Sequence, residues 1–131
     1  MKKIKQIIVI TIAILSITSC NSVSSIYYGS KSDVRRNLEN TEWSDRSYSS
    51  SMYCTLNIGK YSGGKFDANH EIKILGDPAR AEYPLIIKKI KHPQTGLRHY
   101  ALAVKTNWII FIPDTGEFYI DEKLIATLRK K

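Results

Sequence analysis

The predicted hairpin around Gly96 brings three cations together. If its loop spans residues 93–96, Lys91 pairs with Arg98, and Lys89 lies two residues further along the same strand face. The remainder of that face is apolar, with Leu85, Ile87, Tyr100, Leu102 and Val104. A positive tip on an apolar base can contact phosphate or carboxylate groups, so Lys89, Lys91 and Arg98 are the candidate anion or partner site. The alternative is a solvated hairpin end whose charges serve solubility.

The opposite face of this hairpin carries two histidines. His92 and His99 are diagonal neighbours there, close enough for one metal ion to reach both. A stable metal site needs a third or fourth ligand. Neither strand supplies a nearby carboxylate or thiolate, and His70 and Glu71 lie on a separate run. We therefore expect surface histidines, and neither a metal nor another cofactor.

The candidate nucleophiles lack the partners that catalysis requires. Cys54 alternates with apolar residues, which predicts a buried, inert thiol; a disulfide to another chain is the alternative. The serines between Ser44 and Ser51 form neither a Gly-x-Ser-x-Gly nor a Ser-x-x-Lys motif, so we expect a loop there. The sequence thus predicts a protein that is not an enzyme.

Length and composition allow one small globular domain. The chain has 131 residues, of which 43% are hydrophobic and 24% charged, as is ordinary for a folded protein. Its net charge is +8; Lys2, Lys3 and Lys5 contribute three of these charges, which leaves +5 beyond residue 19. An excess of this size favours contact with an anionic membrane surface.

The first 20 residues have the order of a secretory signal. Basic residues at positions 2–5 precede an apolar run over 7–17, and two small residues then lead to Cys20. The apolar run is shorter than the roughly 20 residues of a membrane-spanning helix. We expect residues 1–19 to be a cleaved signal peptide, and an uncleaved anchor is the alternative.

Residues 17–20, Ile-Thr-Ser-Cys, resemble the lipobox of bacterial lipoproteins. The resemblance implies that Cys20 is lipidated on its sulfur and becomes the mature N-terminus. Asn21 after it implies sorting to the outer membrane, facing the periplasm, in a Gram-negative host. Residues 20–32 would then be a lipidated tether, and Cys54 has no internal disulfide partner. An exported protein is not expected to bind nucleic acid; an ordinary cleaved signal is the alternative to lipidation.

Beyond the tether, short apolar runs alternate with turns. A short helix over 32–40, with Ser32 as its N-cap and with Val34 and Leu38 on one face, precedes them. Residues 108–112 are apolar on both strand faces, which places them centrally in a sheet, whereas 122–131 fit either a helix or a strand. Seven or eight runs at close spacing predict a single mainly β domain over 33–131, an antiparallel meander closed into a small barrel or folded into a sandwich.

Thr41-Glu42-Trp43 resembles the Gly-x-Trp motif in the first strand of lipocalin-like barrels, with threonine in place of the glycine. The resemblance covers residues 41–129. It implies a barrel with an apolar interior and places Arg129 as a packing partner of Trp43.

These features predict a lipid-anchored protein of the cell envelope that acts as a non-catalytic binding or structural module, in the manner of an accessory, pilot or immunity-type protein. Its expected partners are the membrane, through Cys20, and a protein of the envelope. The oligomeric state is left open. The alternative is a lipocalin-like carrier of a small apolar ligand, which follows from Trp43 and the alternating strands.

Overall fold

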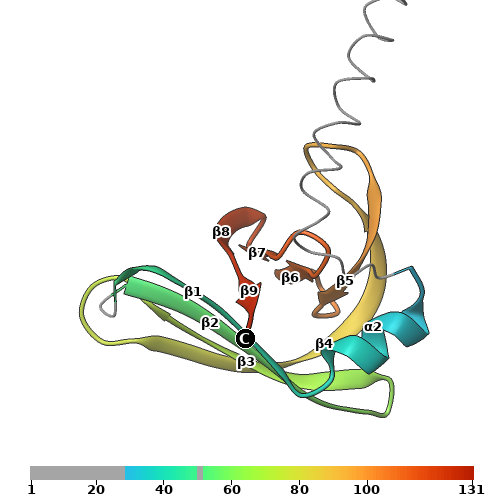
Figure 1. Ribbon diagram of the computed structural model, residues 1–131, viewed down its shortest axis with the longest axis horizontal. Coiled ribbons are helices and arrows are strands. Elements are labelled where there is room, and N and C mark those ends of the chain that lie inside the picture. The colour runs from blue at the N-terminus through green and yellow to red at the C-terminus, as the bar shows by residue number, and fades with distance from the viewer. Residues whose placement is uncertain (1–28, 50–51) are drawn as a thin grey trace, which may run out of the picture.

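The computed structural model describes residues 29–49 and 52–131 (Figure 1). The predicted signal peptide over 1–19, the lipidation site Cys20 and the tether up to residue 28 lie outside the described residues. Within the described part of the chain, no helix is long and apolar enough to cross a membrane.

The described residues form one short helix and nine strands. Each strand from β1 to β7 pairs antiparallel with the next one along the chain, and β9 returns to pair with β1, so the meander closes into a nearly complete barrel (Figure 1). The elements are α2 (Lys31–Leu38), β1 (Thr41–Ser49), β2 (Met52–Ser62), β3 (Lys65–Lys73), β4 (Ala79–Lys91), β5 (Arg98–Ala103), β6 (Ile109–Ile112), β7 (Glu117–Ile120), β8 (Lys123–Thr127) and β9 (Arg129–Lys130).

The mainly β prediction is confirmed, and the barrel is the alternative that the chain adopts. The expected seven or eight strands become nine in the described residues, for two reasons. The predicted serine-rich loop is wrong over 44–49, which belongs to β1. The ambiguous segment 122–131 forms two strands, β8 and β9, instead of a helix. A polar β1 is compatible with its place near the sheet edge, where β9 pairs with only two of its residues.

Helix α2 begins earlier than the sequence suggests. Its N-cap is Ser30 instead of the predicted Ser32, because the extended Ser30 accepts a hydrogen bond at its hydroxyl from the Asp33 amide (3.2 Å). Val34 and Leu38 share the buried face, as predicted. The helix therefore packs two apolar side chains onto the barrel core.

The junction between β8 and β9 closes the barrel. Leu128 is buried between the two strands, and its amide donates to the Gly116 carbonyl (2.7 Å) in the turn between β6 and β7. One residue later the chain crosses to β1, where Arg129 pairs with Ser44 and Lys130 with Trp43. Two residues of β9 thus connect the last strand of the meander to the first.

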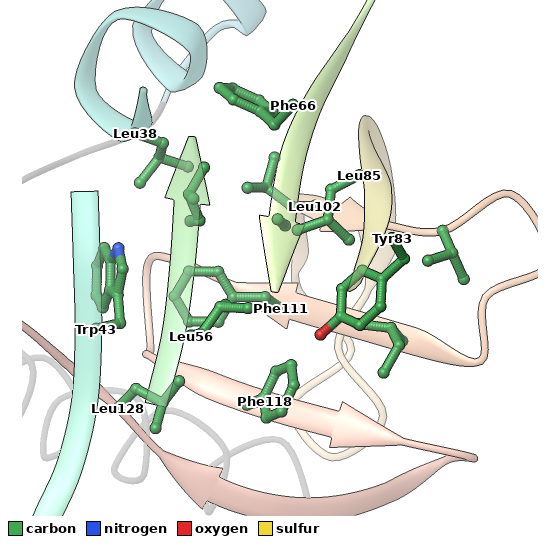
Figure 2. Close-up of a cluster of buried hydrophobic side chains, with 14 of the residues drawn as sticks. Leu38, Trp43, Leu56, Phe66, Tyr83, Leu85, Leu102, Phe111, Phe118 and Leu128 are labelled. Carbon is green, nitrogen blue, oxygen red and sulfur yellow. The ribbon is translucent and has the colours of Figure 1, made fainter. Parts of the chain in front are cut away.

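Packed side chains occupy the barrel interior. Aromatic rings from distant strands meet there: the Trp43 and Phe111 rings are 4.8 Å apart at 70°, an edge-to-face contact (Figure 2). Leu56, Leu85 and Phe118 belong to the same buried cluster (Figure 2). The predicted packing of Arg129 on Trp43 is wrong, because Arg129 pairs with Ser44 and so lies on the opposite strand face from Trp43, which pairs with Lys130.

Candidate functional site

The predicted register of the β4–β5 hairpin is confirmed. Lys91 pairs with Arg98, and Lys89 with Tyr100. Lys89, Lys91 and Arg98 are all exposed at the end of the hairpin, and we call these three residues the cationic tip. The Lys89 ammonium lies 5.2 Å from the centre of the Tyr100 ring, a cation–π distance. None of the three cations forms an ion pair with any residue in 29–49 or 52–131. Beside them, the Leu97 side chain is 61% exposed.

His92 holds the loop of this hairpin in place. Its Nδ1 accepts hydrogen bonds from the backbone amides of Gln94 (3.0 Å) and Thr95 (3.2 Å). Because Nδ1 is an acceptor, the proton of the neutral ring is on Nε2, which donates to Glu117 Oε1 (2.6 Å). Gly96 completes the loop with a φ of +75°, which favours glycine. One buried imidazole therefore connects the loop to β7.

A second histidine–carboxylate pair lies beside the first. His99 Nδ1 is 2.8 Å from Asp114 Oδ2, and the His92 and His99 rings are 5.9 Å apart. The Glu117 carboxylate also accepts from the hydroxyls of Thr115 (3.1 Å) and Tyr119 (3.3 Å). Burial and the neighbouring Glu117 raise the pKa of Tyr119. The two pairs together form a brace between the loop end of the β4–β5 hairpin and the β6–β7 hairpin.

The prediction of surface histidines is wrong, whereas the two strands of the hairpin themselves supply no carboxylate to them, as predicted. His92 is only 4% exposed, and the carboxylates come from Asp114 and Glu117, which are on a different hairpin. The diagonal contact between the two histidines is confirmed. No pattern in the sequence places residue 117 against residue 92, because their contact depends on the curvature of the barrel. The described residues contain no group of three or more side chains arranged to hold a metal ion.

Two other chemistry-bearing groups are enclosed in the core. The Cys54 thiol is free and buried, as predicted, and burial raises its pKa to about 12, with a further contribution from Asp45. His70 and Tyr83 share a hydrogen bond of 2.6 Å between Nδ1 and the phenol oxygen. Burial lowers the pKa of His70 and raises that of Tyr83, so the folded protein favours the uncharged form of both groups.

A pocket lies where β8 and β1 separate beyond the β9 junction. It has a volume of about 190 Å³. Figure 1 shows β8 standing away from the sheet of β1, β2 and β3. We call this region the β1–β8 slot. Its lining is mostly apolar: Asp45, Met52, Tyr53, Cys54, Ile72, Lys73, Ile74, Ile125 and Ala126.

Comparison with models of protein families, with curated proteins and with solved structures finds no match to this chain.

The brace gives a direct test of how the tip is held. Replacing His92 with Phe keeps an aromatic ring but removes the acceptor for two amides and the donor to Glu117. We expect a loss of about 1–3 kcal/mol in the free energy of unfolding, and faster hydrogen exchange at the Gln94 and Thr95 amides. Glu117→Gln keeps an acceptor oxygen for Nε2 and serves as the milder control. Unchanged exchange at Gln94 and Thr95 in H92F would contradict the brace.

Proposed function

We propose that this chain is a lipid-anchored protein of the bacterial cell envelope that acts as a non-catalytic binding module, in the manner of an accessory, pilot or immunity-type protein. In a Gram-negative host it would be attached to the outer membrane and face the periplasm. The lipobox-like residues 17–20 support the anchor, since lipidation of Cys20 would keep the folded domain within a tether length of the bilayer.

The cationic tip is the observation that carries the binding role. Three exposed cations without ion partners in the described residues stand at the end of a hairpin whose loop is fixed by His92. Each Lys or Arg near an anionic membrane surface contributes roughly 1 kcal/mol of attraction. A tip of this kind can contact the phosphates of lipid headgroups or the carboxylates of an envelope protein.

The structural roles of Cys54, His70 and His92 support the proposal that the protein is not catalytic. The Cys54 thiol has a pKa of about 12 in the core, so very little of it is the reactive thiolate at neutral pH. His70 is paired with Tyr83, and both ring nitrogens of His92 have partners in the brace. These histidines stabilise the fold and the hairpin loop.

A carrier of a small apolar ligand is the second candidate. The β1–β8 slot favours it, because a pocket of about 190 Å³ with a mostly apolar lining is present there. The barrel interior does not favour it, because packed side chains occupy it. Lipid recovered by solvent extraction of the purified protein would favour the carrier over the binding module.

The tip is tested by neutralising it. Leu97→Cys places an exposed thiol beside the tip, and a fluorophore attaches there because the Cys54 thiol is buried. In the lipidated full chain, we expect brominated lipids to quench this fluorophore in vesicles that contain phosphatidylglycerol. Changing Lys89, Lys91 and Arg98 to Gln should weaken the membrane-contacting state by about 100-fold.

The matched control makes the same charge change elsewhere. Lys60, Lys65 and Lys105 are exposed and lie away from the tip, so their replacement by Gln should leave quenching unchanged. Equal quenching by the two triple variants would contradict a local role for the tip. A third outcome would identify protein carboxylates as the anions that the tip contacts. In that case anionic vesicles do not quench the fluorophore of the protein with the wild-type tip, and an envelope protein is lost from pull-downs when the tip is neutralised.

A further inference from the structure

The strand edges on either side of the β1–β8 slot are incompletely paired. On its outer edge, β1 pairs with β9 only at Trp43 and Ser44. Strand β8 pairs with β7 on one side, and no strand of the described ranges pairs with its other side. An open strand edge presents backbone N–H and C=O groups that can pair with another chain.

The slot also exposes large apolar side chains. Ile125 on β8 is 40% exposed, and Met52 and Ile74 across the slot are 43% and 58% exposed. Leu124, which precedes Ile125 on β8 and does not line the pocket, is 50% exposed. Natural sheet edges usually carry charges or prolines that block pairing. Strand β8 has one charged residue, Lys123 at its start, and a register shift at Ile125. The exposed apolar side chains that follow Lys123 leave the rest of this edge suited to a chain that adds to it.

The pocket size indicates what such a chain would insert. Pockets that enclose a whole small-molecule ligand measure about 300–1,000 Å³, whereas this one has about 190 Å³. It is lined by Cys54 and Ile72 from the barrel sheet and by Ile125 and Ala126 from β8. The space is therefore suited to one apolar side chain of a larger partner.

The charged residues near the slot indicate which side chains the partner carries. Lys73 lines the pocket and Lys123 is exposed at the start of β8, and neither forms an ion pair with a described residue. Asp45, the acidic residue of the lining, already has a partner. Lys73 is thus the cation of the pocket lining that can meet a ligand, and Lys123 on β8 is a second one outside the lining. The exposed acids Asp121 and Glu122 lie in the turn before β8, whereas Lys73 and Lys123 complement carboxylates.

We propose that the β1–β8 slot binds an extended acidic peptide segment of a partner protein, which adds to the open edge of β8 as a further strand. One apolar side chain of the segment fills the pocket, and its acidic residues meet Lys73 and Lys123. The hydrogen bonds of the added strand supply affinity, and the pocket supplies specificity. This inference names the partner class of the proposed binding module, and it rests on that proposal only for the compartment.

The test uses the full lipidated chain in nanodiscs of zwitterionic lipid, so that the cationic tip has no anionic surface to contact. The probe is a blocked peptide of alternating sequence, Asp-Val-Thr-Phe-Thr-Val-Glu, and affinity is measured by fluorescence anisotropy. We expect saturable binding, with changes in amide chemical shift confined to β8 and the slot. The same peptide with alternate backbone nitrogens methylated keeps its side chains but loses N–H donors, and it should bind at least about tenfold more weakly.

Variants of the protein distinguish binding at the slot from non-specific hydrophobic binding. Ile125→Gln should weaken the binding of the unmethylated peptide by about tenfold. Leu97→Gln, the same kind of change at the exposed hairpin tip, should leave the affinity for the peptide unchanged. Equal affinity for methylated and unmethylated peptides would overturn strand addition. Failure of the peptide to bind while palmitate binds the slot would overturn the peptide proposal in favour of a lipid site. Either outcome leaves the measurements on the tip and on Cys20 unaffected.

Discussion

Cys20→Ala is expected to abolish lipidation and to release the protein from the membrane. Each buried methylene of an acyl chain contributes about 0.8 kcal/mol, so two or more chains hold a protein essentially permanently, whereas none remains once the sulfur is removed. Cells given labelled palmitate should incorporate it into the wild-type protein and not into C20A. The wild-type protein should stay in the membrane fraction when membranes are extracted with carbonate. C20A, which lacks the lipid anchor, should be released from that fraction.

The second cysteine supplies the control. Cys54 is free and only 4% exposed, and the pKa of its thiol is raised to about 12, so Cys54→Ala should incorporate as much palmitate as the wild-type protein. Label retained in C20A, or label lost in C54A, would contradict the assignment of the anchor to Cys20. A wild-type protein that is unlabelled and recovered from the cytosol would remove the basis of the proposed location.

Gly116→Ala is expected to destabilise the fold by about 3–5 kcal/mol. Gly116 has a φ of +80°, where a side chain is strained, and a Cβ there would lie 2.3 Å from the Leu128 carbonyl oxygen. That oxygen belongs to backbone at the β8–β9 junction and cannot move aside as a flexible side chain would. The variant should therefore weaken the Leu128–Gly116 hydrogen bond that closes the barrel. Urea unfolding of the full chain measures the change.

A second glycine distinguishes the cost of backbone strain at positive φ from the cost of the steric clash with Leu128. Gly64 also has a positive φ, +84°, but an added Cβ would meet no atom within 4 Å. Gly64→Ala therefore incurs only the conformational cost, about 1–2 kcal/mol. The difference between the two variants measures the close approach of Leu128. Equal destabilisation by G116A and G64A would indicate that the junction is not a closing contact.

The strands of the central hairpin could be predicted because their signals are local. Pro93 and Gly96 define the loop, and the loop length fixes which residues pair, so the Lys91–Arg98 register follows from the sequence. The buried state of Cys54 follows in the same way from alternation along β2. These features depend on neighbours within a few residues.

The brace and the slot could not be predicted, because both join residues that are distant in sequence. His92 meets Glu117 across 25 positions, and Asp45 and Ile125 share a pocket although they lie near opposite ends of the described chain. The helix–strand ambiguity of 122–131 has the same origin. Its spacing fits both structures, and pairing with β7 and β1 decides for strands.

The sequence by itself determined the mainly β composition, the register of the cationic tip and the signal-like order of residues 1–20, because periodicity, turn residues and charge order are local properties. Only the tertiary structure decided that the meander closes as a barrel, that the interior is packed, and that two carboxylates brace the histidines. Those outcomes depend on how much each strand twists and on which distant side chains then meet, and neither quantity is encoded within one stretch of the chain.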